Sequence, residues 1–200
     1  MSEAAAPRVR KPASVRRPEI LAAAAVEFAE TGLAGTRLEA IAARAQISHP
    51  RVVQMFGSKR GLFLEVVDAV FDRVDAAFTD AADSSGAETG PTLVVLGDAY
   101  RRLLQRDRTV ALVMLQSYAA AGDDTVRDAV AHRYLDLQRT VADLTGADGL
   151  QVRTFFATGL VVTVSTALAL PGKRTDAQWG GWLLELVTPA TSAVSPGPSR

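Results

Sequence analysis

The chain has 200 residues, of which 48% are apolar and 22% are charged, a composition typical of a globular protein rather than a disordered one. It has no cysteine, which excludes disulfides, thiolate nucleophiles and thiolate metal sites and favours a reducing, cytoplasmic location. Its two histidines, His49 and His132, lie far apart in the sequence, so we expect no metal site and no cofactor.

The net charge is zero but unevenly placed. Residues 1–60 contain ten Lys and Arg and five Asp and Glu, a net of +5, and the remaining residues carry −5. A basic head on an acidic body favours a polyanionic partner for the head. The alternative is a basic tail that binds nothing, because five of the ten positive charges precede Pro18.

Both ends of the sequence are expected to lack a fixed fold. Residues 1–17 contain prolines and small residues and predict a flexible basic arm, and residues 191–200 predict a disordered tail. No apolar stretch precedes Ile20, so we expect no signal peptide. The most apolar run, Phe155–Leu170, is shorter than the roughly 18–20 residues that span a bilayer, which predicts a buried helix.

The first predicted helix covers residues 18–30. Pro18 suits its first turn, apolar residues recur at helical spacing, and Gly32 ends it. The next helix covers residues 36–44, where Thr36 and Glu39 have the spacing of a capping box.

A turn of three residues, 45–47, separates that helix from a short one. Ser48 is a second predicted N-cap and opens a helix that runs from His49 to about Phe56. Ser58 then caps a longer helix. Further helices are predicted at about 59–82, 91–106, 109–121, 123–145, 148–170 and 176–187. We therefore expect an all-α protein of about nine helices, with one domain over residues 18–64 and a second over residues 65–190.

Two short helices joined by a three-residue turn are typical of a helix-turn-helix. Such a motif needs a second helix that buries its late apolar residues and exposes its early polar ones to the major groove. Here Val52 and Phe56 are expected to face the core, and His49, Arg51 and Gln54 to face outward.

The stretch from Pro18 to Val66 resembles the DNA-binding domain of the TetR family. The matching anchors are Phe28-Ala-Glu-Thr-Gly32, Thr36-Arg-Leu-Glu-Ala-Ile41-Ala, Ile47-Ser48, Phe56-Gly-Ser-Lys59 and Leu62-Phe63. They cover about a quarter of the chain. The remainder resembles the family only in being a helical domain of suitable length.

The resemblance implies a set of residues that bind DNA. Ser48, His49, Pro50 and Arg51 stand at the front of the recognition helix, where Arg51 could read guanine and Gln54 adenine. Thr36, Arg37 and Lys59 stand where the family holds phosphates. The sequence departs from the family at Val53 and Met55, which replace an aromatic residue and a histidine that often contact the DNA backbone.

The family also implies a helical body that dimerises and encloses an effector. The dimer seam is expected at residues of the last two predicted helices, namely Phe156, Gly159, Leu160, Thr163, Trp179, Trp182 and Leu183. The alternative is that the apolar helix at 148–170 is only the centre of its own domain. The candidate effector pocket contains aromatic and methionine side chains that could equally be ordinary core, namely Phe71, Tyr100, Met114, Tyr118 and Phe155.

The expected function is that of a sequence-specific DNA-binding transcriptional regulator, a homodimer on a double-stranded operator and a repressor released by a small apolar effector. A membrane partner is not expected. An enzyme is not expected, because the sequence has no phosphate-binding glycine loop, no paired carboxylates with a supporting base and no metal-ligand spacing. The alternative is a helical protein-interaction module with a vestigial helix-turn-helix.

Overall fold

The computed structural model describes residues 13–85 and 92–170, and every element of secondary structure within them is a helix. The helices are α1 (Ala13–Gly35), α2 (Leu38–Arg44), α3 (His49–Phe56), α4 (Lys59–Asp83), α5 (Leu93–Arg106), α6 (Arg108–Ala119), α7 (Asp124–Thr145) and α8 (Gly149–Ala167). The all-α prediction is confirmed. Eight of the nine predicted helices fall in the described residues, and the ninth, at 176–187, lies outside them.

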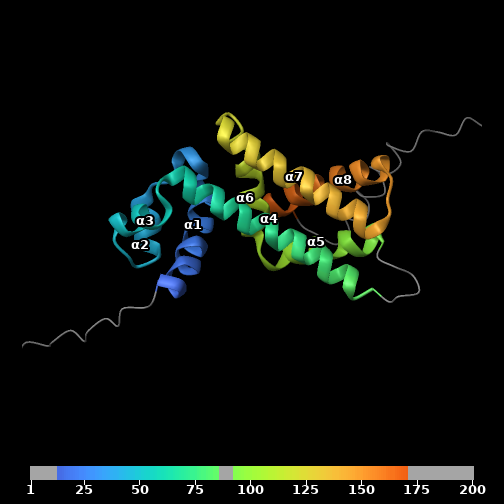
Figure 1. The fold of residues 1–200 in the computed structure, drawn as a ribbon, viewed down its shortest axis with the longest axis horizontal. Coiled ribbons are helices and arrows are strands. Elements are labelled where there is room, and N and C mark those ends of the chain that lie inside the picture. The colour runs from blue at the N-terminus through green and yellow to red at the C-terminus, as the bar shows by residue number, and fades with distance from the viewer. Residues whose placement is uncertain (1–12, 86–91, 171–200) are drawn as a thin grey trace, which may run out of the picture.

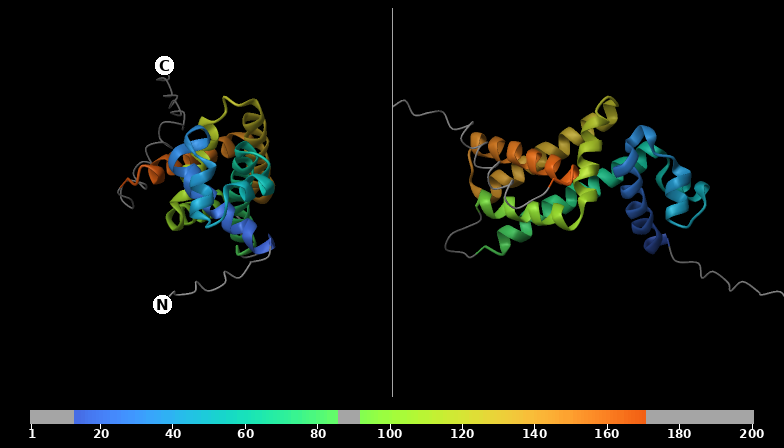
Figure 2. Two further views of the ribbon diagram at one scale, coloured as in Figure 1. Left: turned by 90° about the vertical axis from the view of Figure 1, so that its left-hand side faces the viewer. Right: turned by 180° about the vertical axis from the view of Figure 1, so that it is seen from behind.

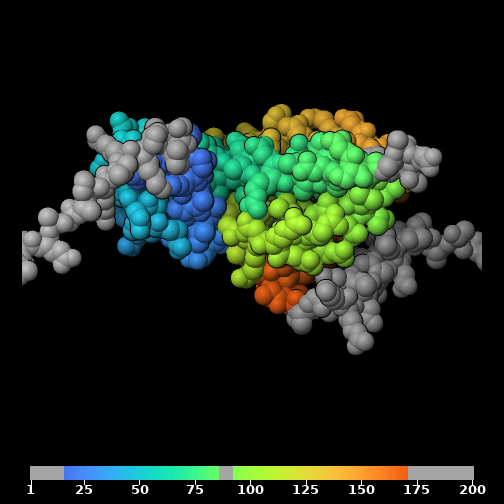
Figure 3. Space-filling model, turned by 90° about the horizontal axis from the view of Figure 1, so that it is seen from below, coloured from blue at the N-terminus to red at the C-terminus, as the bar shows by residue number. Residues whose placement is uncertain are grey.

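Helices α1–α3 form a head at one end of the molecule and α5–α8 form the body at the other, with α4 running from head to body (Figure 1). The view from behind shows the same two lobes (Figure 2). In the space-filling view the blue α1 region lies directly against the green helices of the body (Figure 3). Because α1 packs against both α4 and α6, head and body share one continuous apolar core.

The head is held by the apolar face that the helical spacing predicts. Ile20, Ala24 and Phe28 of α1 are fully buried, and the Phe28 ring meets the Phe63 ring of α4 edge to face at 4.9 Å between centroids. Such pairs stabilise a core by about 0.5–1.5 kcal/mol beyond the area that they bury. This contact fixes α1 on α4, and α2 and α3 pack onto that pair.

The start of α1 differs from the prediction. The helix begins at Ala13, so residues 13–17 belong to α1 rather than to a flexible arm, while residues 1–12 and the tail at 191–200 lie outside the described residues. Pro18 lies inside the helix as a result. The early start places Arg16 and Arg17 on an ordered element.

The predicted capping box at Thr36 is wrong. Arg37 occupies the N-cap position of α2 without a side-chain cap bond. The Thr36 hydroxyl instead donates to the carbonyl of Gly32 at 2.7 Å and lies 2.6 Å from the Thr31 hydroxyl. The turn at Gly32, with its positive φ, brings the Gly32 carbonyl close to Thr36, and this carbonyl accepts from both the hydroxyl and the backbone amide of Thr36.

Gly32 ends the regular part of α1, as predicted, with a backbone φ of 68° that favours glycine. It also lies against the body, because a Cβ built on Gly32 would stand 2.6 Å from Oε1 of Gln116 on α6. The absence of a side chain therefore permits both the turn and the close approach of α6.

We predict that Gly32→Ala lowers the free energy of unfolding by about 2–3 kcal/mol, because a backbone with φ 68° and ψ 179° lies in a region that is essentially confined to glycine. Gly146→Ala is the comparison, since Gly146 has the left-handed helical conformation, with φ 66° and ψ 14°, which should cost another residue about 1 kcal/mol. Urea unfolding measures both. Equal losses would show that the backbone at Gly32 adapts to a side chain.

Candidate nucleic-acid interface and body cavity

Helices α2 and α3 are joined by the predicted turn of three residues. The turn closes through backbone bonds from Ala45 N to the Ile41 carbonyl and from Ile47 N to the Ala42 carbonyl, both 2.9 Å, with Gln46 at a φ of 54°. Ile41 and Ala42 of α2 are buried. The two helices are thus held at a fixed angle by a short link and a shared apolar underside.

The short helix α3 buries one face and exposes the other. Val52 and Phe56 are buried, as predicted, which leaves Pro50, Arg51 and Gln54 exposed on the opposite side. Among the described residues, the Arg51 and Gln54 side chains have no hydrogen-bond or ion-pair partner. An exposed row of unpaired donors on the front of a short helix suits the reading of a polar groove.

The N-terminal end of α3 adds two further polar groups. Ser48 occupies the N-cap position in an extended conformation, but its hydroxyl makes no cap bond and stays available. The His49 side chain is 42% exposed, with Nε2 3.8 Å from the Glu39 carboxylate. Both residues therefore lie on the surface beside Arg51.

An open hollow lies beside α3, between it and the N-terminal part of α1. Arg16 of α1 and Arg51 of α3 both line this hollow, together with Gln46 and Ser48 from the turn. The hollow is predominantly polar and carries two arginines without an acidic partner among the described residues. It is suited to an anion such as a phosphate.

Arg17, the neighbour of Arg16, has a different environment. Its guanidinium pairs with Glu65 of α4 at 2.5 Å, donates to the Met55 carbonyl at 3.2 Å and stacks 4.5 Å from the centre of the Phe56 ring. These contacts tie α1 to the end of α3 and to α4. Arg17 therefore holds the head together and is not free to contact DNA.

Two predicted phosphate contacts make hydrogen bonds within the head. The Thr36 side chain is only 3% exposed and its hydroxyl bonds within the head, which corrects the expectation that this hydroxyl reaches DNA. The Lys59 ammonium donates to the carbonyls of Ala34 and Thr36 at 3.1 and 3.0 Å. One of its three donors remains, so Lys59 joins α4 to the α1–α2 turn. Arg37 is exposed, as expected.

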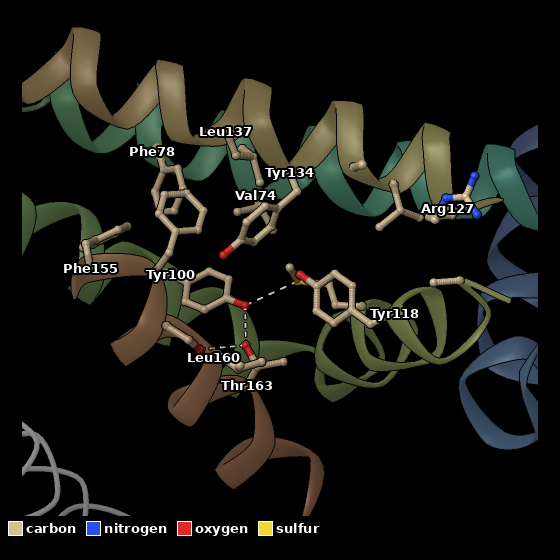
Figure 4. Close-up of a pocket in the computed structure, with 16 residues that line it drawn as sticks. Val74, Phe78, Tyr100, Tyr118, Arg127, Tyr134, Leu137, Phe155, Leu160 and Thr163 are labelled. Carbon is tan, nitrogen blue, oxygen red and sulfur yellow. Dashed lines mark hydrogen bonds between the residues drawn. The ribbon is translucent and has the colours of Figure 1, made fainter. Parts of the chain in front are cut away.

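The body contains a cavity of about 410 Å³ between α4, α5, α6, α7 and α8 (Figure 4). Its lining is mostly apolar and aromatic. The lining residues are Val74, Phe78, Tyr100, Met114, Tyr118, Ala121, Arg127, Val130, Ala131, Tyr134, Leu137, Phe155, Phe156, Gly159, Leu160 and Thr163.

Three tyrosine hydroxyls point into this cavity (Figure 4). The Tyr100 hydroxyl is engaged, at 2.6 Å from the Thr163 hydroxyl and 3.3 Å from the Met114 sulfur. The hydroxyls of Tyr118 and Tyr134 have no partner among the described residues. Burial raises the pKa of Tyr100 to about 12, and burial also raises the pKa of Tyr118 and of Tyr134. All three phenols are therefore neutral near pH 7.

Residues 20–66 match the family model described as bacterial regulatory proteins, tetR family. That segment contains α2, α3 and the parts of α1 and α4 that hold them. Residues 20–66 are therefore a domain of the type found in bacterial regulatory proteins of the TetR family. A comparison of the sequence with curated proteins gives no match.

Solved structures share the fold over most of the chain. A TetR-like regulator from Rhodococcus sp. RHA1 is 24% identical, covers 87% of this chain and 96% of its own, and has a TM-score of 0.66. FadR from Bacillus subtilis, in complex with stearoyl-CoA, is 17% identical with coverages of 85% and 96% and a TM-score of 0.67. GusR from Salmonella enterica is 18% identical with coverages of 90% and 98% and a TM-score of 0.66. The TetR-type fold therefore extends through the body.

Four of the five pocket residues expected from the sequence line the cavity, namely Tyr100, Met114, Tyr118 and Phe155. Phe71 does not: it is fully buried, with the Arg133 guanidinium 5.9 Å from its ring, because the cavity begins a turn further along α4, at Val74.

Tyr134, which lies on α7 among charged residues, also lines the cavity and was not predicted from the sequence. Its signal was the apolar stripe Val130, Tyr134, Leu137 and Val141, whose spacing places the ring on the inner face of α7.

Helix α8 lines the cavity with one face and exposes the other face to solvent. Phe156, Gly159, Leu160 and Thr163, expected at the dimer seam, all line the cavity. Thr163 is 2% exposed with its hydroxyl on Tyr100, which corrects its placement in a seam. The outward stripe contains Leu160, Val164 and Leu168, at 49%, 38% and 64% exposed. Trp179, Trp182 and Leu183 lie outside the described residues.

By length and composition α8 is the one helix of the described residues that could cross a membrane, although such a helix is weak evidence by itself. In this fold α8 packs against α5, α6 and α7 and contributes to the cavity. Its apolar character thus has a role inside the body.

We predict that Arg17→Ala lowers the free energy of unfolding by about 1 kcal/mol, since it removes a half-exposed ion pair and a cation–π contact. Arg16→Ala is the matched control and should change stability by less than about 0.5 kcal/mol, because Arg16 has no partner among the described residues. Chemical denaturation compares the two variants. An Arg16→Ala loss as large as that of Arg17→Ala would contradict these assignments.

Proposed function

We propose that this chain is a dimeric, cytoplasmic repressor that binds an operator through α3 and releases it when a small apolar effector occupies the body cavity. The observation that supports operator binding most strongly is the arrangement of α3. Its apolar underside is locked by Val52 and Phe56, while Arg51 and Gln54 stand exposed and unpaired among the described residues. The proposed activity is binding, without catalysis.

In this proposal α3 enters the major groove by its N-terminal end. Arg51 pairs with a guanine edge, Gln54 with an adenine edge, and Ser48, His49 and Pro50 lie against the groove wall. Arg37, Arg16 and the free donor of Lys59 contact phosphates. Arg16 is included because the early start of α1 brings it to the same hollow as Arg51.

The dimer is proposed to form on the outward face of α8. Leu160, Val164 and Leu168 recur at intervals of four residues and make one apolar stripe on the surface. A stripe of this kind is the pattern by which helices pair. A second copy of the chain would cover it by the same stripe, as a two-fold dimer requires.

Effector release is proposed to act through α6. This helix lines the cavity with Met114 and Tyr118, and between them Gln116 lies against Gly32 of the head. A ligand that moves α6 therefore moves the contact at which α1 ends. The ligand shifts the equilibrium between two arrangements of the heads only if it binds one arrangement more tightly than the other.

We predict that Arg51→Ala costs about 1–3 kcal/mol of binding to an operator selected from random DNA, and that the loss is confined to one base position. Arg16→Ala should weaken all sequences alike and lower the salt dependence by about one phosphate contact. Gel-shift titration at several salt concentrations measures both effects. The control is Arg139→Ala, an exposed arginine on α7 that should leave binding unchanged.

Two outcomes would contradict the DNA-binding proposal. Arg51→Ala and Arg16→Ala could both bind like the parent, which would place the interface elsewhere. The parent could also select no sequence even at low salt, which would favour the interaction module.

We predict that Val164→Glu converts the dimer to a monomer, because the charge would be buried without a partner at the centre of the seam. Leu135→Glu is the matched control: Leu135 is an exposed apolar residue on α7, outside the stripe, and its variant should remain a dimer. Sedimentation equilibrium gives the masses, and circular dichroism checks that both variants fold. A dimeric Val164→Glu protein would move the seam off this face.

A further inference from the structure

The cavity is walled by a continuous set of aromatic rings. Tyr118 meets Tyr134, Tyr134 meets Phe156, and Phe156 meets Phe155, with centroid distances of 6.3, 5.3 and 5.6 Å and steep interplanar angles. The set continues from Phe155 through Phe78 to Tyr100 at 5.7 and 6.1 Å. A ligand in this cavity meets ring faces and edges on several sides, which favours a flat aromatic body.

Two hydroxyls in this aromatic wall lack partners. The Tyr100 hydroxyl is satisfied by Thr163 and Met114, but those of Tyr118 and Tyr134 point into the cavity with no acceptor among the described residues (Figure 4). Neither hydroxyl oxygen is buried from solvent, and a ligand that displaces water from them leaves them unpaired unless it supplies a partner. Because a neutral phenol donates one hydrogen bond, this pair calls for an acceptor atom on the ligand.

Among the described residues, Arg127 is the one charged side chain that lines the cavity, and it lies at the end opposite Phe155 (Figure 4). Arg127 is already paired with Asp124 at 2.6 Å and Asp128 at 3.0 Å. An anion such as an acyl-CoA would lose its hydration without gaining a free cation in return.

The size of the cavity limits the ligand further. A volume of about 410 Å³ lies near the lower end of the range typical of small-molecule sites. It suits a compact molecule of two or three rings.

We infer that the cavity binds a neutral, compact aromatic compound whose oxygen acceptor is held jointly by the hydroxyls of Tyr118 and Tyr134. The inference rests on the proposed function for its regulatory meaning, since it names the chemical class of the effector. The binding of such a compound to the protein is measurable without DNA.

The test compares three tricyclic probes of similar shape by calorimetry on the full chain. Fluorenone carries a carbonyl acceptor, fluorene has none, and fluorene-9-carboxylate adds a negative charge. We expect fluorenone to bind at least about tenfold more tightly than fluorene, a difference of about 1.4 kcal/mol, and the carboxylate to bind more weakly than either.

Matched variants assign the effect to the two hydroxyls. Tyr118→Phe and Tyr134→Phe keep the rings and should each weaken fluorenone binding about tenfold while leaving fluorene binding unchanged. Leu135→Glu, outside the cavity, should change neither. Thermal unfolding confirms that the variants are folded. Equal affinities for fluorenone and fluorene, tight binding of the carboxylate, unchanged affinity in both phenylalanine variants or no binding of any probe would overturn the inference.

Operator release is read separately from ligand binding. If fluorenone binds as expected but leaves the complex with operator DNA intact at saturation, the ligand class stands and its role as effector fails. If it both binds and releases DNA, the two proposals are supported together.

Discussion

The left-handed backbone at Gly32 is the constraint on which the arrangement of this molecule depends. It ends the regular part of α1, and its carbonyl accepts both the backbone amide and the hydroxyl of Thr36, so that α2 starts in a fixed direction. The same residue lies against the Gln116 side chain of α6. The direction of the helix-turn-helix and its position on the body are therefore determined at one point.

The basic residues of the head fall into two groups, those that hold its helices together and those that are exposed on its surface. Arg17 and Lys59 are engaged in contacts that join α1, α3 and α4. Arg16, Arg37 and Arg51 remain without side-chain partners among the described residues. Because two neighbouring arginines on one helix have opposite environments, the charge of a basic segment does not by itself locate the residues that meet a polyanion.

Helix α8 has two roles in the body. Its inner face closes an aromatic cavity, and its outer face presents an apolar stripe to solvent. A helix that is apolar on nearly every side fulfils both roles, which explains why its sequence resembles a membrane span. The cavity and the proposed seam share this helix and α6 adjoins it, so a ligand could act on the distance between two heads.

The sequence alone determined the helical class, the order of the first eight helices and the two faces of α3, because these follow from local spacing, caps and glycine breaks. Four of the five residues that it predicted for the pocket line the cavity, since Tyr100, Met114, Tyr118 and Phe155 are aromatic or soft apolar side chains on inward faces. Such signals lie within one or two turns of helix and need no knowledge of the rest of the chain.

Only the tertiary structure decided which polar groups are free. The hydroxyl of Thr36 and the ammonium of Lys59 are drawn to carbonyls at the end of α1, and Thr163 turns to Tyr100 across 63 positions of sequence. Phe71 and Val74 lie a single turn apart on α4, yet only Val74 reaches the cavity. These outcomes depend on which atoms other helices bring close, and that proximity is a property of packing, which residue spacing along one helix does not encode.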